Sequence, residues 1–218
     1  MIRPLILMSN GINSTLLLQH ALMRGDTDVL HVKDENNFSD VVHLQKLIEQ
    51  CESLPESKGK VVNVLVEEAP AIKHIGKLES SHLMGVLMAA MAVLNPVEHS
   101  FVLIGGGQDS SVIDSNAKLK QMWDAMITLS KGKIVHLMFD QRGFDLIDIV
   151  KSINENVLQF VIPCDNPKPV MLVGKPAAYK VCRHCPSCKK YQEAVLAIKY
   201  KNVTENQDLV RRLEEVMV

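Results

Sequence analysis

The chain has 218 residues, of which 47% are hydrophobic and 22% charged, so it has the composition of a globular protein of one or two domains. Its 24 Lys and Arg residues nearly balance its 25 Asp and Glu residues, which argues against a general nucleic-acid-binding protein and a polybasic membrane binder. The longest apolar stretch, residues 83–94, is shorter than the ~20 residues of a membrane-spanning helix. Because the chain also opens without a signal-peptide pattern, we expect a cytoplasmic protein with no membrane association.

Five short apolar runs predict buried strands, and segments with apolar residues at helical spacing follow them. The predicted strands are residues 4–8, 28–33, 61–66, 101–104 and 134–138. The predicted helices are residues 13–24, 40–53, 80–94, 115–130 and 140–153. Because strands and helices alternate, we expect an α/β fold: a doubly wound, mainly parallel five-stranded sheet with helices on both faces. The helix at 80–94 is apolar nearly all round and is therefore expected to be buried.

The sequence changes in character after residue 155. Residues 164–180 contain three prolines and a glycine, which predicts an irregular segment. Helices are expected over residues 187–200 and about 205–216. We therefore divide the chain into an α/β domain, residues 1–155, and a cysteine knot with C-terminal helices packed on that domain, residues 156–218.

The turn after the first predicted strand has the composition of an anion-binding site. Small residues between a strand and a helix let backbone N–H groups and the helix dipole point at the same spot, and hydroxyl groups add donors. The predicted nucleotide-binding residues are Ser9, Asn10, Gly11, Asn13, Ser14 and Thr15. The alternative is an ordinary turn in which Asn13 or Ser14 caps the following helix.

A second loop, residues 105–114, follows the fourth predicted strand and starts with three glycines. Glycines allow a backbone to approach a ligand closely, and the Asp side chains could hold a metal or a sugar hydroxyl. The predicted nucleotide or substrate residues of this loop are Gly106, Gly107, Asp109 and Asp114. The alternative is a flexible loop in which Asp114 or Ser115 caps the next helix.

Four of the five cysteines lie in the last quarter of the chain and predict a metal site. Cys182, Cys185 and Cys188 have Cys-x2-Cys-x2-Cys spacing, which brings three thiolates to one turn, and Cys164 is the expected fourth ligand. His184 is the alternative fourth ligand. Zinc is the expected metal, with an iron–sulfur cluster as the alternative. Cys51 lies on the apolar stripe of a predicted helix and is expected to be a core residue.

Together, the turn at residues 9–15 and the C-terminal cysteines resemble the 7-cyano-7-deazaguanine synthase family of pyrophosphatase-loop ATP enzymes. The family turn reads Ser-Gly-Gly-x-Asp-Ser-Thr, where this chain has Ser-Asn-Gly-Ile-Asn-Ser-Thr. The family knot is a single Cys followed by Cys-Gly-x-Cys-x-x-Cys at the start of a helix, where this chain has Cys164 and then residues 182–188. A Gly followed by an Asp-containing loop after the fourth strand corresponds to residues 105–114.

The resemblance implies an ATP-dependent enzyme of queuosine biosynthesis. It would activate 7-carboxy-7-deazaguanine as an acyl-adenylate, use ammonia to form an amide, and activate the amide again to give the nitrile. It further implies ATP and Mg²⁺ at residues 9–15, a structural zinc ion on the four cysteines, and a homodimer. Nucleic acid is an unlikely partner.

The chain also departs from the family pattern. Asn10 replaces a Gly, and Asn13 replaces an Asp that could help to hold Mg²⁺. Residues 78–82 stand where the family has Pro-Gly-Arg-Asn. These changes favour a second interpretation, a non-catalytic or repurposed binding or assembly protein that retains the fold. Residues 106–111 offer a rival position for the nucleotide loop, but residues 9–15 are preferred because they follow the first strand.

Overall fold

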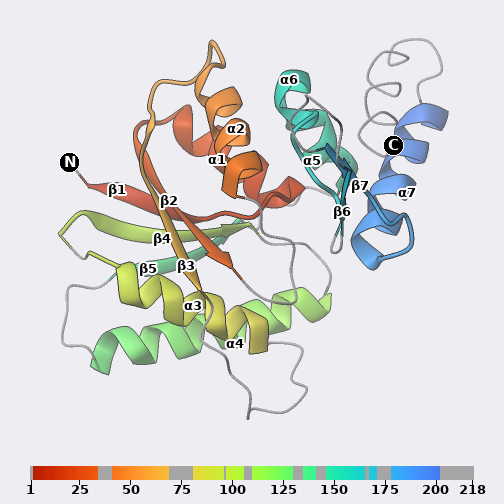
Figure 1. Cartoon of the computed structure of the whole chain (residues 1–218). Helices are drawn as coiled ribbons and strands as arrows, with labels where there is room; N and C mark the ends of the chain where they lie inside the picture. Colours follow the sequence, from red (N-terminus) through yellow and green to blue (C-terminus); the bar gives the residue numbers. More distant parts are fainter. Residues whose placement is uncertain are drawn as a thin grey trace.

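The computed structural model describes residues 2–33, 41–68, 81–95, 97–105, 110–129, 135–140, 146–164, 167–170 and 178–201. Five strands form one parallel sheet in the order β3-β2-β1-β4-β5, which confirms the predicted α/β class and the five-stranded parallel sheet. The strands are β1 (Arg3–Leu7), β2 (Thr27–Lys33), β3 (Val61–Glu68), β4 (His99–Gly105) and β5 (His136–Asp140). The sheet lies between helices α1 and α2 on one side and α3 and α4 on the other (Figure 1).

The helices agree with the predicted periodicity, with some shifts at their ends. They are α1 (Ile12–Leu22), α2 (Val41–Glu52), α3 (Ser81–Val93), α4 (Ser110–Leu129), α5 (Leu146–Ser152), α6 (Glu155–Leu158) and α7 (Pro186–Lys201). The predicted start of a helix at residue 140 is wrong, because Asp140 pairs with Gly105 at the end of β5. The short helix α6 was not predicted, since four residues are too few to show a helical period.

Alternate residues of the central strands β1, β2 and β4 supply two separate cores, as expected for strands covered on both faces. The expectation that residues 61–66 form a buried strand is wrong, because Val62, Val64 and Val66 of the edge strand β3 are exposed. In β1, Ile6 packs with α1, α2, α5 and α7 on one face, whereas Leu5 and Leu7 pack with α3 and α4 on the other. On the second face the buried Trp123 of α4 donates its indole N–H to the Val135 carbonyl oxygen over 2.8 Å. This bond satisfies the polar atom of the largest core residue and ties α4 to the approach of β5.

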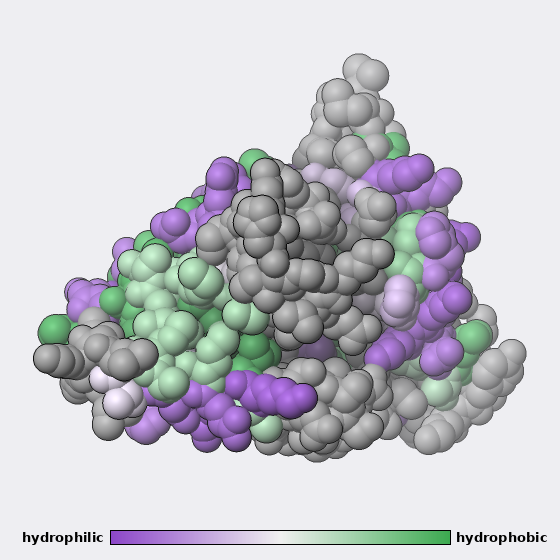
Figure 2. All heavy atoms as spheres, turned by 90° about the horizontal axis from the view of Figure 1, so that it is seen from below, coloured by the Kyte–Doolittle hydropathy of each residue, from purple (hydrophilic) through white to green (hydrophobic). Residues whose placement is uncertain are grey.

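The expectation that the helix at 80–94 is buried is wrong in part. Leu87 and Ala90 are buried against the sheet, but Met88 is 46% exposed. Figure 2 shows hydrophobic surface on the face of the molecule that α3 and α4 form. Only the side of α3 that packs on the sheet is buried. The all-round apolar sequence of this helix therefore predicted more burial than the structure shows.

The segment after residue 155 contains more regular structure than predicted. Residues 164–180, expected to be irregular, include the antiparallel strands β6 (Lys168–Val170) and β7 (Ala178–Lys180). Helix α7 confirms the helix predicted over 187–200, and its buried residues Tyr191, Ala194 and Val195 belong to the same core as α1 and α5. The helix predicted over about 205–216 lies outside the described residues.

A buried polar cluster joins the amino ends of four strands. Asp28 accepts hydrogen bonds from Arg3 Nε and His99 Nε2, each over 2.9 Å, and from the backbone and side-chain N–H groups of Asn63, each over 3.1 Å. His99 Nδ1 in turn accepts the Asn95 backbone N–H. Burial raises the pKa of Asp28, but the hydrogen bonds from His99, Arg3 and Asn63 and the charge of Arg3 outweigh that effect and lower the pKa below 3.8. These contacts fix the end of the sheet that faces away from the site described next.

Candidate functional site

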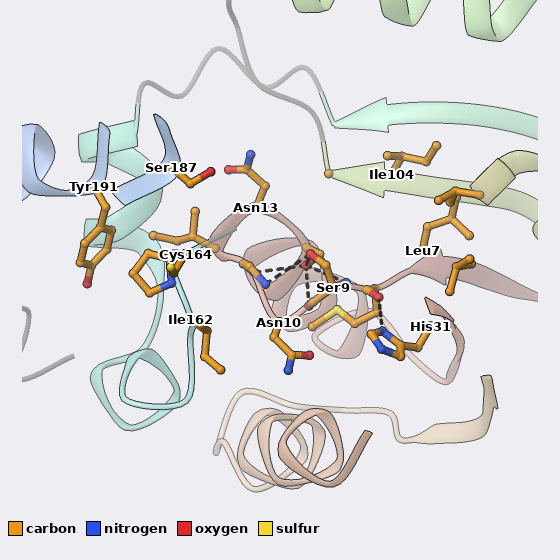
Figure 3. Close-up of a pocket in the computed structure, with 18 of the residues that line it drawn as sticks. Leu7, Ser9, Asn10, Asn13, His31, Ile104, Ile162, Cys164, Ser187 and Tyr191 are labelled. Atoms are coloured by element: carbon orange, nitrogen blue, oxygen red, sulfur yellow. Dashed lines mark hydrogen bonds between the residues drawn. The ribbon is translucent and has the colours of Figure 1, made fainter. Parts of the chain in front are cut away.

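A cavity of about 440 Å³ lies at the carboxyl ends of β1, β2 and β4, where ligands bind in open parallel sheets. One wall is the turn after β1, residues 9–14, and the other comes from the cysteine-bearing segment, with Cys164, Ser187, Lys190 and Tyr191. Figure 3 shows Leu7 and Ile104 at one end of the cavity and Ser187 and Tyr191 at the other. The structure thus brings the predicted turn and part of the cysteine knot to one site.

The turn after β1 leaves the start of α1 open toward the cavity. Gly11 occupies the N-cap position with extended backbone (φ −87°, ψ 168°) and no side-chain cap. The alternative in which Asn13 or Ser14 caps the helix is therefore wrong. The N–H groups of residues 12–14 have no intrahelical acceptor, since the first i→i−4 bond runs from the Thr15 N–H to the Gly11 carbonyl. An anion at this point would meet free donors and the positive end of the helix dipole.

Hydroxyl groups hold the turn in this shape. The Ser9 N–H donates to Ser14 Oγ over 3.2 Å, and the two Ser side chains lie 2.9 Å apart. Thr15 Oγ1 donates to the Gly11 carbonyl oxygen over 2.8 Å. The predicted residues Ser14 and Thr15 therefore shape the turn, whereas the N–H groups of residues 12–14 beside them are left without an intrahelical acceptor.

The second predicted loop is only partly visible. Gly106, Gly107 and Asp109 lie outside the described residues. Asp114 lies inside α4, which begins at Ser110, so the expectation that residue 114 is in the loop or caps the helix is wrong. Gly105 has a packing role, because a Cβ there would lie 2.8 Å from the Asn13 carbonyl carbon and 2.9 Å from the Ser14 nitrogen. The end of β4 can thus approach the start of α1 only as glycine.

The polar groups of the cavity suit an anion better than a cation. No Asp or Glu lines it among the described residues, and Lys190 is the one Lys or Arg that does. The expected Mg²⁺ therefore finds no carboxylate in the described lining. Two buried polar atoms in the lining, Asn13 Oδ1 and the Tyr191 hydroxyl, have no hydrogen-bond partner in the described structure.

The sequence alone did not identify several lining residues. His31, near the end of β2, donates from Nδ1 to the Met8 carbonyl oxygen over 2.9 Å and borders the cavity. Its position near the carboxyl end of a predicted parallel strand was the available signal. Ser187, Lys190 and Tyr191 gave no such signal, because their placement depends on how α7 packs against the α/β domain.

The four predicted cysteine ligands meet at one point. The Sγ atoms of Cys164, Cys182, Cys185 and Cys188 all lie within 4.8 Å of one another, and those of Cys182 and Cys188 are 3.9 Å apart. Sulfur atoms bonded to one tetrahedral zinc ion at ~2.3 Å lie ~3.8 Å apart, so the cluster could bind a metal such as zinc. His184 is not a member of this group, and its Nδ1 donates to the Cys182 carbonyl oxygen instead.

Backbone donors favour the thiolate form of Cys182. Backbone hydrogen bonds from His184 and Cys185 lower the pKa of Cys182 to about 6 against the opposing effect of burial. Burial raises the pKa of Cys188. Cys51, by contrast, is buried in the α1–α2 core, where burial raises its pKa to about 12. The prediction that Cys51 is a core residue is confirmed.

The turn of the cysteine knot contains an unusual backbone conformation. Arg183 has φ 65° and is the one residue other than glycine with positive φ in the described chain. Glycine adopts this conformation without a steric cost, unlike residues with a side chain. Arg183 therefore adopts this conformation at a steric cost.

None of the helices that the structure describes is both long and apolar enough to cross a membrane. No protein-family model, no curated protein and no solved structure matches this chain.

Proposed function

We propose that this chain binds a phosphate-bearing nucleotide in the cavity and acts as an ATP-dependent enzyme of the 7-cyano-7-deazaguanine synthase kind. The observation that carries the proposal is the uncapped start of α1, which faces a cavity of about 440 Å³. Three backbone N–H groups and the helix dipole converge there, and the same cavity has an apolar end suited to a heterocycle. We also infer a doubly wound connection of the sheet, a homodimer, and zinc as the metal of the cysteine cluster.

The proposed reaction begins with a carboxylate, which is a poor electrophile. Attack of the 7-deazaguanine carboxylate on the α-phosphorus of ATP forms an acyl-adenylate and releases pyrophosphate. Ammonia then displaces AMP to form the amide. The amide oxygen attacks the α-phosphorus of a second ATP with release of pyrophosphate, and loss of AMP and a proton from the resulting imidate leaves the nitrile. The N–H groups of residues 12–14 would stabilise charge on the phosphates. Mg²⁺ is given no step, because the described lining offers it no carboxylate.

A second candidate is a binding protein without catalysis. It is favoured by one observation, the absence of Asp and Glu from the described lining, together with Asn13 where the family has Asp. Such a protein would still bind a phosphate-bearing ligand at α1 but would not release pyrophosphate from ATP. Binding and turnover therefore have to be measured separately.

The decisive experiment measures both on the zinc-loaded full chain. Calorimetry with ATP and with inorganic pyrophosphate tests binding, and pyrophosphate release from ATP with 7-carboxy-7-deazaguanine and ammonia tests catalysis. Binding with release supports the enzyme, and binding without release supports the binding protein. If neither ligand binds, the site at α1 is wrong.

Asn13→Asp tests whether the anion lies at the start of α1. An added carboxylate in the first helical turn favours the helix dipole but repels a bound phosphate. In Mg²⁺-free buffer we expect pyrophosphate to bind about tenfold more weakly, the effect of ~1.4 kcal/mol. Val42→Asp, which adds the same charge at the exposed start of α2, is the matched control and should change the affinity less than about twofold.

A further inference from the structure

The second wall of the cavity comes from the first turns of α7. Ser187, Lys190 and Tyr191 have i, i+3, i+4 spacing, so they share one face of the helix, and all three line the cavity. Figure 3 shows Ser187 and Tyr191 on the side of the cavity toward Asn13. Lys189 and Lys190 are both exposed, but Lys189 lies on another face of the helix and is not part of the lining. Of these two adjacent lysines, only Lys190 lines the cavity.

Two anchors fix the direction in which this face of α7 points. Tyr191 is 1% exposed and packs with Ile149 and Val150 of α5 in the core shared with α1. One turn earlier, Cys188 belongs to the cysteine cluster. Lys190 lies between these anchors, so its backbone is held at the rim of the cavity both by core packing and by the cluster.

The two walls are also joined directly. The Ile162 N–H donates to the Asn10 carbonyl oxygen over 2.8 Å, and Cys164, two residues later, lines the cavity. The chain that carries the first metal ligand is therefore hydrogen-bonded to the turn at the start of α1.

The negative charge of a zinc-bound cysteine cluster would oppose anion binding in the cavity unless a cation lies on the same wall. Four thiolates around one Zn²⁺ ion have a net charge of −2, and the Cys164 thiolate is part of the cavity lining. An anion bound at α1 is repelled by that charge unless a positive group lies nearby. Lys190 supplies the one such group among the described lining residues.

We propose that Lys190 binds the phosphate groups of the ligand at α1, and that a metal ion on the four cysteines holds Lys190 in place. This inference rests on the proposed function, because it requires an anion at the start of α1. It adds that the ligand carries at least two phosphate groups, one at the N–H groups of residues 12–14 and one at Lys190. Single phosphate should then bind more weakly than pyrophosphate.

The first test compares two neighbouring lysines. Calorimetry with inorganic pyrophosphate on the zinc-loaded full chain should show about tenfold or more weaker binding for Lys190→Met, the effect of losing a hydrogen bond to a charged group. Lys189→Met removes the same charge from the same helix and should bind within about twofold of the wild type. Lys190→Arg should keep most of the wild-type affinity for pyrophosphate. Lys190→Met should weaken the binding of inorganic phosphate less than the binding of pyrophosphate. Equal affinities for Lys190→Met and Lys189→Met would overturn the inference.

The second test concerns the metal. In the wild type, removing zinc should weaken pyrophosphate binding, and in Lys190→Met it should have little further effect, because the two changes remove the same contact. Circular dichroism shows whether the metal-free chain is folded. A metal-free chain that is folded and binds pyrophosphate more weakly supports the role of the metal. A chain that binds equally well without metal, or that unfolds and also loses the remaining binding of Lys190→Met, contradicts a specific role of the metal at Lys190.

The two proposals can fail separately. If Asn13→Asp weakens binding but Lys190→Met does not, the site at α1 stands and the role of Lys190 is wrong. If wild-type protein binds neither pyrophosphate nor ATP, both proposals are wrong.

Discussion

The two ends of the parallel sheet use buried polar groups in opposite ways. At the amino end, Asp28 is 1% exposed and both of its carboxylate oxygens accept hydrogen bonds, from Arg3, His99 and Asn63. At the carboxyl end, α1 begins without a side-chain cap, and the N–H groups of residues 12–14 have no intrahelical acceptor. The amino end is complete within the chain, whereas the carboxyl end leaves hydrogen-bonding capacity for a ligand.

We therefore expect the amino end to contribute mainly to the stability of the fold and the carboxyl end mainly to ligand binding. A buried polar group whose bonds are all made within the protein stabilises the fold, and one that faces a cavity without a partner is stable only if a ligand or water completes it. The metal cluster belongs to the second region, because Cys164 is both a potential ligand and part of the cavity wall. Changes at the two ends should therefore affect different measurements.

The largest effect is expected at the cysteine cluster. Cys188→Ser removes one of four ligands and should lower the metal content of the purified chain from about one ion to nearly none, with a large loss of stability. The matched control is Cys51→Ser, because both cysteines are 0% exposed but Cys51 lies in the core away from the cluster. Elemental analysis measures the metal, and a visible absorption spectrum distinguishes zinc from an iron–sulfur cluster. Equal metal content in the two variants would show that the four cysteines do not hold the ion.

The next effect is expected at the amino end of the sheet. Asp28→Asn leaves Arg3 without its buried carboxylate and places an amide N–H among hydrogen-bond donors, so we expect the free energy of unfolding to fall by about 3 kcal/mol. Urea denaturation measures this loss. The folded variant should bind pyrophosphate with unchanged affinity, since Asp28 is not part of the cavity lining. Weaker pyrophosphate binding by folded Asp28→Asn would show that the amino end of the sheet also affects ligand binding, contrary to this prediction.

A smaller, pH-dependent effect follows from the same carboxylate. The pKa of Asp28 is below 3.8 in the folded chain, so its ionised form contributes stability above that value. This contribution is lost as the pH falls through the lower, folded-state pKa. The stability difference between the wild type and Asp28→Asn should therefore be constant above about pH 5 and shrink below about pH 4, as measured by urea denaturation across that range. A difference that stays constant down to about pH 2 would contradict the lowered pKa.

The sheet and the cysteine cluster could be predicted from the sequence, but the Asp28 cluster could not. The strands were predictable because runs such as Leu5–Leu7 are apolar on both faces, and the cysteine ligands because their spacing is short and specific. The residues of the Asp28 cluster are separated by up to 96 positions, from Arg3 to His99, and only the order of the strands brings them together. No local pattern marks such a cluster.

The far wall of the cavity was hidden for a similar reason. Lys190 has the same surroundings in the sequence as Lys189, and only the packing of Tyr191 on α5 decides which lysine faces the cavity. The turn at residues 9–15 was predictable because its ligand-binding groups are local backbone N–H groups. The alternative in which Ser14 caps the helix is wrong because Ser14 bonds to Ser9 and Gly11 instead of to the helix donors.

The smallest effect concerns the strain in the carboxyl-end region. Arg183 has φ 65°, and a side chain in this conformation costs about 1 kcal/mol relative to glycine. Arg183→Gly should therefore stabilise the zinc-loaded chain by up to about 1 kcal/mol, partly offset by the larger conformational freedom of glycine in the unfolded chain. Arg183→Ala removes the same side chain but keeps the steric cost, so it should give no such gain. Thermal denaturation of the zinc-loaded variants compares the two, and equal stabilities would show that the backbone at Arg183 stores no strain.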